Sequence, residues 1–367
     1  MTWTAADYSF MSRALQLARK GLYTTHPNPR VGCVLIRDGR IIAEGWHEVT
    51  GGAHAEINAL NSASGEVTGA SCYVTLEPCC HTGRTPPCTD ALVRAGIGKL
   101  FAAMSDPNPS VSNQGLSTLE QAGIETDLGL LRSQAQDLNP GFIMRMTLQR
   151  PYVRCKLGMS LDGRTALANG DSQWITGEAA REDVQRLRAQ SSAVMTGIGT
   201  VLVDDPGLNV RDIDLNGRQP LRVVIDPGLK FPASAKMLHL PGRTLIFTTL
   251  KERALQARLS DAGAEVIVTG PASETFMDTV LGYLAGEEEI NEVLLEAGSK
   301  LAGSLLSKGL IDELVLYQAP VLLGDSSKGL FHLPALQSMT DRIQLRLIET
   351  RQVGEDMRLT LKVKSKK

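Results

Sequence analysis

The sequence predicts an α/β protein built from two successive domains, and three observations support this. Short apolar runs rich in β-branched residues alternate with longer segments whose apolar residues recur at helical spacing, as in layered α/β folds. The chain has 367 residues, more than the roughly 100–200 residues of one typical domain. The alternation restarts after Pro151, so we expect one domain at residues 1–147 and a second at residues 151–367.

The first half begins with a helix and continues with a hairpin. Asp38-Gly39 favours a tight turn, so the apolar runs 31–37 and 40–46 form an antiparallel pair. A loop dense in glycine and proline covers residues 78–87. The other expected elements are helices at 7–21, 54–63, 89–96 and 115–123, strands at 70–76 and 99–104, then a short strand and a helix ending near Met146.

The second half alternates in the same way. We expect strands at 152–159, 193–196, 221–226, 244–248, 265–269, 292–296 and 313–318. The intervening helices are expected at 178–190, 252–263, 274–285 and 301–308. The final segment, 343–364, is expected to form two antiparallel strands around Gly354-Glu355.

Composition narrows the classes of function. The net charge of −2 provides no positive field for a polyanion, and 4% aromatic residues argue against stacking on single strands, so we expect no nucleic-acid partner. The N-terminus is typical of a helix and not of a signal peptide, and no apolar run approaches the ~18 residues of a membrane span. We therefore expect a cytoplasmic protein without membrane contact, whose six cysteines are metal ligands or buried thiols.

The strongest chemical signal is the set His54, Glu56, Cys79 and Cys88. One imidazole and two thiolates suit Zn²⁺ and leave a fourth position for water. Zinc lowers the pKa of that water towards ~7, and a neighbouring carboxylate can carry its proton. At the start of a helix, His54 and Glu56 can both reach one cavity although they are only two residues apart.

The spacing resembles, but does not equal, the H-x-E and P-C-x-x-C signature of zinc deaminases. The position of the second cysteine is occupied by Thr82, and the next separated cysteine is Cys88, which we take as the third ligand. Cys80 adjoins Cys79, and neighbours on an extended chain point apart, so Cys80 is a bystander. The alternative is a closed structural zinc knot in which His81 supplies a fourth ligand.

Weaker signals leave alternatives open. Cys33, Cys72 and Cys155 lie in apolar strands and are expected to be buried thiols. His47 is either a substrate contact or a capped surface residue. Residues 293–304 run from a strand through glycine into a helix, which suits a phosphate, whereas the absence of a G-x-G-x-x-G run disfavours a Rossmann fold.

Three stretches together resemble a known family. They are Thr25–Cys33, His54–Glu56 and the long loop T-L-E-P-C-C-H-x-G-R-T-P-P-C at 75–88. This pattern is similar to that of the bifunctional pyrimidine deaminases/reductases of riboflavin biosynthesis, and the resemblance extends over essentially the whole chain.

The resemblance implies a cytidine-deaminase-like, three-layer α/β/α domain at the N-terminus. It also implies zinc on His54, Cys79 and Cys88, Glu56 as the proton shuttle, and Asn28 as a contact of the pyrimidine. Residues 106–109 would shape the pocket rim. The implied substrate is a phosphorylated pyrimidine, 2,5-diamino-6-ribosylamino-4(3H)-pyrimidinone 5′-phosphate, which loses its ring C2 amine.

In the second half, residues 156–164, 172–176 and 199–211 resemble the family's reductase domain. This implies a dihydrofolate-reductase-like α/β fold that uses NADPH. The implied cofactor contacts are Gly158, Trp174, Thr200, Asp204, Gly298, Ser299, Lys300, Leu301, Ala302, Gly303 and Ser304. The implied substrate contacts are Ser172, Arg188, Leu208, Arg211 and Glu296. The family also suggests a homo-oligomer.

Several of these assignments have structural alternatives. Lys156 and Glu296 are candidates for polar groups that assist reduction, but they would equally fit a buried ion pair at the strand ends. Arg188 and Arg211 can grip a phosphate as multi-donor forks or remain surface charges. Pro227 departs from the family, because it lacks an N–H where we expect a small hydroxyl residue.

Three rival functions are weaker. The first is a nucleic-acid editing deaminase, which a basic stripe would support. The second is a non-catalytic zinc module, against which Glu56 counts. The third is a deaminase whose second domain is only a scaffold, which NADPH binding would exclude.

Overall fold

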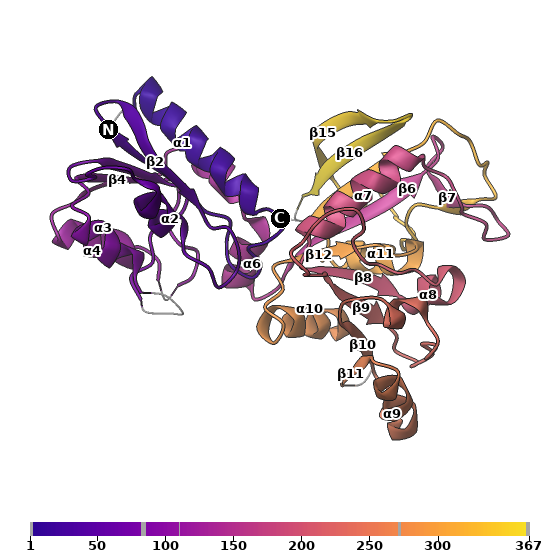
Figure 1. Cartoon of the computed structure of the whole chain (residues 1–367). Helices are drawn as coiled ribbons and strands as arrows, with labels where there is room; N and C mark the ends of the chain where they lie inside the picture. The colour runs from indigo at the N-terminus through magenta and orange to yellow at the C-terminus, as the bar shows by residue number, and fades with distance from the viewer. Residues whose placement is uncertain (1–2, 82–85, 110, 271–272, 365–367) are drawn as a thin grey trace. The chain divides into compact units, whose positions relative to one another are not determined.

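A computed structural model describes residues 3–81, 86–109, 111–270 and 273–364. The chain divides into two compact units, Met1–Arg150 and Pro151–Lys367, each with its own sheet and core (Figure 1). Each unit is described by itself below.

The first unit is built on a five-stranded sheet with the order β2-β1-β3-β4-β5. Its strands are β1 (Gly32–Arg37), β2 (Arg40–Trp46), β3 (Ser71–Val74), β4 (Lys99–Ala102) and β5 (Glu125–Leu128). Its helices are α1 (Ala5–Ala18), α2 (Ala55–Ser62), α3 (Cys88–Arg94), α4 (Gln114–Gln121), α5 (Arg132–Leu138) and α6 (Pro140–Leu148). β1 and β2 form the predicted hairpin, and β3, β4 and β5 are parallel.

Two glycines show how helices cover both faces of this sheet. A Cβ on Gly32 would lie 2.0 Å from the carbonyl oxygen of Ala14 in α1. A Cβ on Gly45 would lie 2.2 Å from the amide nitrogen of Ala59 in α2. Gly45 pairs with the residue after Gly32, so the two glycines face opposite sides of the sheet. The unit is therefore a three-layer α/β/α sandwich.

The second unit contains a nine-stranded sheet with the order β11-β10-β9-β8-β12-β6-β13-β16-β15. Its strands are β6 (Tyr152–Met159), β8 (Ala193–Gly197), β9 (Leu221–Ile225), β10 (Thr244–Thr248), β11 (Glu265–Val268), β12 (Glu292–Leu295), β13 (Glu313–Gln318), β15 (Leu345–Val353) and β16 (Asp356–Val363). The strands from β11 to β13 are parallel, whereas β16 and β15 are antiparallel. The β15–β16 hairpin turns at Gly354-Glu355, as predicted.

Helices lie on both faces of this second sheet as well. They are α7 (Glu178–Gln190), α8 (Ile198–Asp204), α9 (Arg253–Asp261), α10 (Phe276–Gly286) and α11 (Ser299–Ser307). Val223 of β9 belongs to a core formed with α10 and α11, whereas its neighbour Val224 belongs to a core formed with α7, α8 and α9. This alternation is what buries both faces of a parallel sheet.

The structure corrects three details of the predicted elements. The single helix expected up to Met146 is two helices, because Pro140 has no N–H and stands at the first position of α6. Residues 198–204 form α8, which the sequence analysis did not predict. A two-stranded sheet of β7 (Arg164–Ala166) and β14 (Lys328–Gly329) was also not predicted, because strands this short carry no periodicity.

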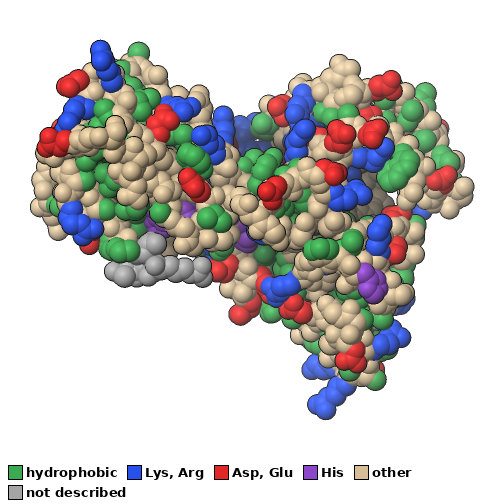
Figure 2. All heavy atoms as spheres, viewed as in Figure 1, with side chains coloured by type: hydrophobic (Ala, Val, Ile, Leu, Met, Phe, Trp, Pro, Cys, Tyr) green, Lys and Arg blue, Asp and Glu red, His purple; other side chains and the backbone are tan. Residues whose placement is uncertain are grey.

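Two surface observations bear on the classes of function. No helix within the described residues is long and apolar enough to cross a bilayer. Acidic and basic side chains are interspersed on the face seen in Figure 2, without a continuous basic stripe on that face.

Candidate functional site

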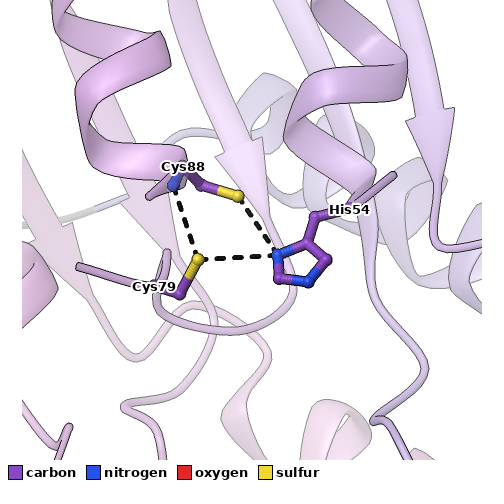
Figure 3. A group of neighbouring side chains, drawn as sticks. All are labelled: His54, Cys79 and Cys88. Atoms are coloured by element: carbon purple, nitrogen blue, oxygen red, sulfur yellow. Dashed lines mark hydrogen bonds between the residues drawn. The ribbon is translucent and has the colours of Figure 1, made fainter. Parts of the chain in front are cut away.

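Three elements of the first unit bring the predicted zinc ligands together. His54 is the N-cap of α2, with extended backbone just before the first helical turn, as expected for a residue at a helix start. Cys88 is the first residue of α3, after Pro87. Cys79 lies in the segment that follows β3. In Figure 3 the Nδ1 edge of the His54 ring faces both cysteine sulfurs.

The distances within this group suit a metal ion. His54 Nδ1 lies 3.2 Å from Cys88 Sγ and 3.5 Å from Cys79 Sγ. The three ligand atoms all lie within 4.8 Å of one another. One imidazole and two thiolates form a donor set typical of zinc. The residues therefore fit the ion that the sequence predicts.

The two thiols differ in acidity because they share a hydrogen bond. The hydrogen bond from Cys88, with those from His54 and the Cys88 backbone, lowers the pKa of Cys79 to about 4. The same contact, together with burial, raises the pKa of Cys88. The hydrogen bond with Cys79 also raises the pKa of His54. A divalent cation bound by these groups would displace the thiol protons.

Glu56 is 4% exposed and lies in the first turn of α2, two residues after His54. Burial raises its pKa to about 7, helped by the negative charge of Cys79 and opposed by hydrogen bonds and by His54. A carboxyl group with a pKa near neutrality can both accept and return a proton.

The structure bears on the closed-knot alternative. Among the described residues, the group with metal-ligand geometry contains His54, Cys79 and Cys88, and His81 is exposed and outside it. Cys80 also lies outside it, with its sulfur 4.0 Å from Oε1 of Gln114. Residues 82–85 of the long loop, including Thr82, lie outside the described residues. His54, Cys79 and Cys88 thus leave the fourth position of a tetrahedral zinc site open.

Asn28 is oriented by a buried histidine. His47 is 2% exposed, and its Nδ1 lies 3.0 Å from the carbonyl oxygen of Ala53, which only accepts. Nδ1 therefore carries the proton, and Nε2, 3.1 Å away, accepts from the Asn28 amide. Burial lowers the pKa of His47, which keeps the ring neutral. Of the two alternatives for His47, the capped surface residue is excluded because the ring is buried. The Asn28 amide nitrogen points to the histidine.

In the second unit, two predicted cofactor segments meet at the carboxyl edge of the sheet. Thr200 and Asp204 lie on α8, which follows β8, and residues 298–304 begin α11, which follows β12. β8 and β12 are adjacent parallel strands. A Cβ on Gly197, the N-cap of α8, would lie 3.3 Å from Leu301 of α11. The starts of α8 and α11 are thus in side-chain contact, and the N–H groups at a helix start favour anionic groups.

Arg188 and Glu296 form a largely buried, bidentate ion pair. Arg188 Nε and Nη2 lie 2.6 Å and 3.1 Å from the two carboxylate oxygens of Glu296. Arg188 Nη1 also donates to the carbonyl of Asn209. Burial lowers the pKa of Lys156, which lies within electrostatic reach of both residues. The predicted alternative was an ion pair of Lys156 with Glu296, whereas the partner that the structure places in contact with Glu296 is Arg188.

The other predicted reductase residues are more dispersed. Gly158 lies in β6, where a Cβ would meet Thr176 at 3.2 Å. Trp174 is 71% exposed, carries the Arg181 guanidinium 4.7 Å above its ring, and borders a cavity of about 370 Å³. Of the predicted cofactor residues, Trp174 alone is among the described residues that line this cavity.

The remaining predicted residues lie in or beside loops. Leu208 is buried, with a positive φ of 48°, and Arg211 is exposed. Ser172 is half-buried. The carbonyl of Pro227 accepts hydrogen bonds from the hydroxyls of Thr248 and Thr249, so those hydroxyl groups stand beside the backbone where a hydroxyl residue was expected.

Comparison with known proteins decides the family. Residues 151–359 match the model of the RibD C-terminal domain, and residues 4–104 match that of the cytidine and deoxycytidylate deaminase zinc-binding region. The chain is 47% identical to the riboflavin biosynthesis protein RibD of Escherichia coli, over 97% of this chain and 99% of that one. The chain belongs to the RibD family.

Solved structures agree with this family assignment. The chain is similar to Acinetobacter baumannii RibD, with a TM-score of 0.91 and 43% identity over 98% of this chain and 99% of that one. A deaminase/reductase from Thermotoga maritima matches with a TM-score of 0.85 and 34% identity, covering 98% and 99% of the two chains. The predicted fold class is confirmed: a cytidine-deaminase-like unit precedes a RibD reductase unit. This RibD family member is a bifunctional riboflavin-biosynthesis enzyme, with a zinc-binding deaminase domain and a reductase domain.

Nothing in the sequence indicated the contacts that two residues, His47 and Glu77, make beside the predicted site. The neutral His47 was left between two roles, and its spacing from Asn28 gave no sign of their contact. Glu77 was quoted only as part of the motif, although a glutamate directly before Pro78-Cys79 signals a carboxylate close to the metal centre.

Proposed function

We propose that this chain removes the ring C2 amine of 2,5-diamino-6-ribosylamino-4(3H)-pyrimidinone 5′-phosphate and then reduces the ribosyl group of the product to ribityl. Residues 1–147 carry the first reaction and residues 151–367 the second. The proposal is carried by the clustering of His54, Cys79 and Cys88 within 4.8 Å, beside the buried carboxyl of Glu56. The identity of the substrate follows from the family.

In the deaminase unit, His54 Nδ1 and the sulfurs of Cys79 and Cys88 would hold zinc. When bound, zinc supplies a water that is activated for attack near neutral pH. Glu56 takes a proton from that water and delivers it to a ring nitrogen. It then takes a second proton from the hydroxyl added to the ring carbon and delivers it to the amine, which leaves as ammonia. Its burial allows both steps, because the protonated and ionised forms then lie close in free energy near pH 7.

Asn28 recognises the pyrimidine in this proposal. Its amide nitrogen is engaged by His47, so its carbonyl oxygen is the group directed elsewhere. A carbonyl oxygen accepts from ring N–H or exocyclic amine groups, which the diaminopyrimidinone offers. The neutral state of His47 thus determines which end of the Asn28 amide meets the substrate.

In the reductase unit, NADPH supplies the hydride when bound, and the protein positions the reacting carbon. The starts of α8 and α11, with Thr200, Asp204 and residues 298–304, would hold its phosphates and ribose. Gly158 and Trp174 would complete the cofactor site. Ser172, Leu208 and Arg211 would contact the substrate.

Arg188, Glu296 and Lys156 would act at the reacting end of the substrate. Arg188 fixes the Glu296 carboxylate with two hydrogen bonds, and the remaining N–H groups of its guanidinium are available to a substrate phosphate or hydroxyl. The lowered pKa of Lys156 makes its ammonium a better proton donor to the opened ribosyl imine.

We also propose that the protein is a homo-oligomer, which sedimentation velocity would test.

One assay tests both reactions. The zinc-loaded protein is incubated with the diaminopyrimidinone phosphate, and ammonia release and NADPH absorbance are followed separately. Ammonia release followed by NADPH consumption is the expected result. Ammonia without NADPH consumption would remove the roles given to Lys156, Arg188 and Glu296. With zinc bound, a lack of ammonia would refute the deaminase assignment of His54, Glu56, Cys79 and Cys88.

A further inference from the structure

Glu77 is a buried carboxylate outside the predicted ligand set. It is 3% exposed and immediately precedes Pro78 and Cys79. Its own N–H donates to the carbonyl of Met104, which follows β4. Burial of a carboxylate is costly unless its oxygens receive hydrogen bonds. Within the described residues, each oxygen of Glu77 receives two hydrogen bonds, from the backbone N–H groups of Asp106, Asn113, Gly115 and Leu116.

One carboxylate oxygen caps a helix from a distance. The N-cap of α4, Asn113, has a left-handed backbone and makes no side-chain capping bond. Glu77 Oε1 instead accepts from the N–H groups of Gly115, at 2.9 Å, and Leu116, at 3.4 Å. Gly115 allows this approach, because a Cβ there would lie 2.0 Å from the carbonyl oxygen of Pro78. The first turn of α4 is therefore pressed against the residue that precedes Cys79.

The other oxygen ties down the segment before α4. Glu77 Oε2 accepts from the N–H groups of Asp106 and Asn113, both at 2.9 Å. Asp106 Oδ1 in turn accepts from the N–H of Asn108 at 2.8 Å. Asp106 is thereby joined through Glu77 to the segment that carries Cys79. Gln114, the first residue of α4, contacts the sulfur of Cys80.

We propose that Glu77 is a positioning residue for deamination, which holds residues 106–109 and 111–116 as a wall of the substrate pocket in register with Cys79. The inference rests on the proposed deaminase function. A glutamate suits this role because four N–H donors require two acceptor oxygens. A glutamine of the same shape has one acceptor, and its NH₂ group would face two of the donors.

The test compares Glu77→Gln with Glu66→Gln, an exposed glutamate of the same unit that serves as a matched control for the loss of charge. Four quantities are measured for each variant. They are the KM and kcat of deamination, the zinc content, and the rate at which the deaminated intermediate is reduced. We expect E77Q to raise the deamination KM by about tenfold or more, because two buried donors lose a charged acceptor. Its kcat should change less, with zinc bound and reductase activity equal to those of E66Q.

Three results would overturn the inference. An E77Q enzyme with the KM of E66Q would show that the wall does not depend on this carboxylate. A fall in kcat of about tenfold with an unchanged KM would assign Glu77 to the chemical step. Loss of both bound zinc and deaminase activity would assign Glu77 to the folding of the metal centre. If wild-type protein releases no ammonia, the proposed function fails, whereas the contact of Glu77 with the start of α4 can still be tested by hydrogen exchange.

Hydrogen exchange measures the contact without relying on activity or on the folding of a variant. In the wild-type protein, the amides of Asp106, Asn113 and Gly115 should be protected although they lie before or at the start of a helix. In E77Q they should exchange at least about ten times faster, while peptides of α2 and of the second unit stay unchanged. Unprotected amides in the wild type would refute the anchoring role.

Discussion

Asp183 of α7 anchors the C-terminal hairpin of the second unit, and Asp183→Asn should destabilise that unit. The carboxylate is 2% exposed and accepts from Tyr317 Oη at 2.6 Å, Arg351 Nη2 at 2.6 Å and Arg358 Nη1 at 2.9 Å. These donors lie on β13, β15 and β16. One side chain thus links a helix to three strands of the sheet.

The magnitude follows from how deeply each partner is buried. Arg351 is 41% exposed, so its bond contributes at most about 1 kcal/mol. Tyr317 and Arg358 are buried or nearly so, and a hydrogen bond to a charged group contributes about 1.5–3 kcal/mol. An asparagine restores about 1 kcal/mol through its single acceptor. The net loss is therefore about 2–6 kcal/mol, which for a unit of this size lowers Tm by roughly 4–24 °C.

The loss should depend on pH in a defined direction. Burial opposes ionisation of Asp183, but the hydrogen bond from Tyr317 and the charge of Arg358 outweigh it and lower its pKa. A lowered pKa stabilises the fold above the unfolded pKa of about 3.9, and this stabilisation disappears as pH falls through the folded value. The difference between wild type and variant should therefore be full at pH 7 and shrink below about pH 4.

Hydrogen exchange of peptides from α7 and β13 reports on the second unit alone, which avoids a two-state assumption for the whole chain. Glu182→Gln, an exposed position on the same helix, is the control for removing a charge. If Asp183→Asn changes the free energy of opening by less than about 1 kcal/mol at pH 7, the energies assigned to the hydrogen bonds of Asp183 are wrong.

Three further predictions concern the two proposed sites. Glu56→Gln should lower the rate of ammonia release by about 10²–10⁴-fold while zinc stays bound; a variant that deaminates at the wild-type rate would contradict the shuttle role. Cys79→Ser should reduce the zinc content measured by mass spectrometry, whereas Cys80→Ser should keep it, and equal loss in both would overturn the ligand assignment. Arg188→Lys keeps the charge but not the bidentate contact with Glu296, so NADPH oxidation should slow by about tenfold or more. Ammonia release serves as its internal control, and unchanged NADPH oxidation would count against the role of the pair.

Periodicity predicted most of the architecture because each strand and helix buries a face that its own residues define. The hairpin at Asp38-Gly39, the turn at Gly354-Glu355 and the start of α2 at His54 all follow from local chemistry. The errors lie where the local signal is short or ambiguous. α8 begins beside Gly197 and Gly199, so glycine at a strand–helix turn concealed a helix of seven residues.

The chemistry of the metal centre could be predicted because it depends on residue type. One histidine and two cysteines form a donor set that favours zinc whatever fold brings them together. Glu56 is close to this set already in the sequence, two residues after His54. The resemblance of the loop at 75–88 then indicated the deaminase family. These features are local in sequence or specific in composition.

Contacts between distant residues were decided by the tertiary structure alone. The pairs Arg188 with Glu296 and Asn28 with His47, and the capping of α4 by Glu77, join segments whose spacing carries no signature. The sequence by itself therefore determined which groups are proposed to perform the chemistry and which faces are buried. Only the packing of strands and helices decided which partner orients each group, because hydrogen bonds require distances that a linear pattern does not specify.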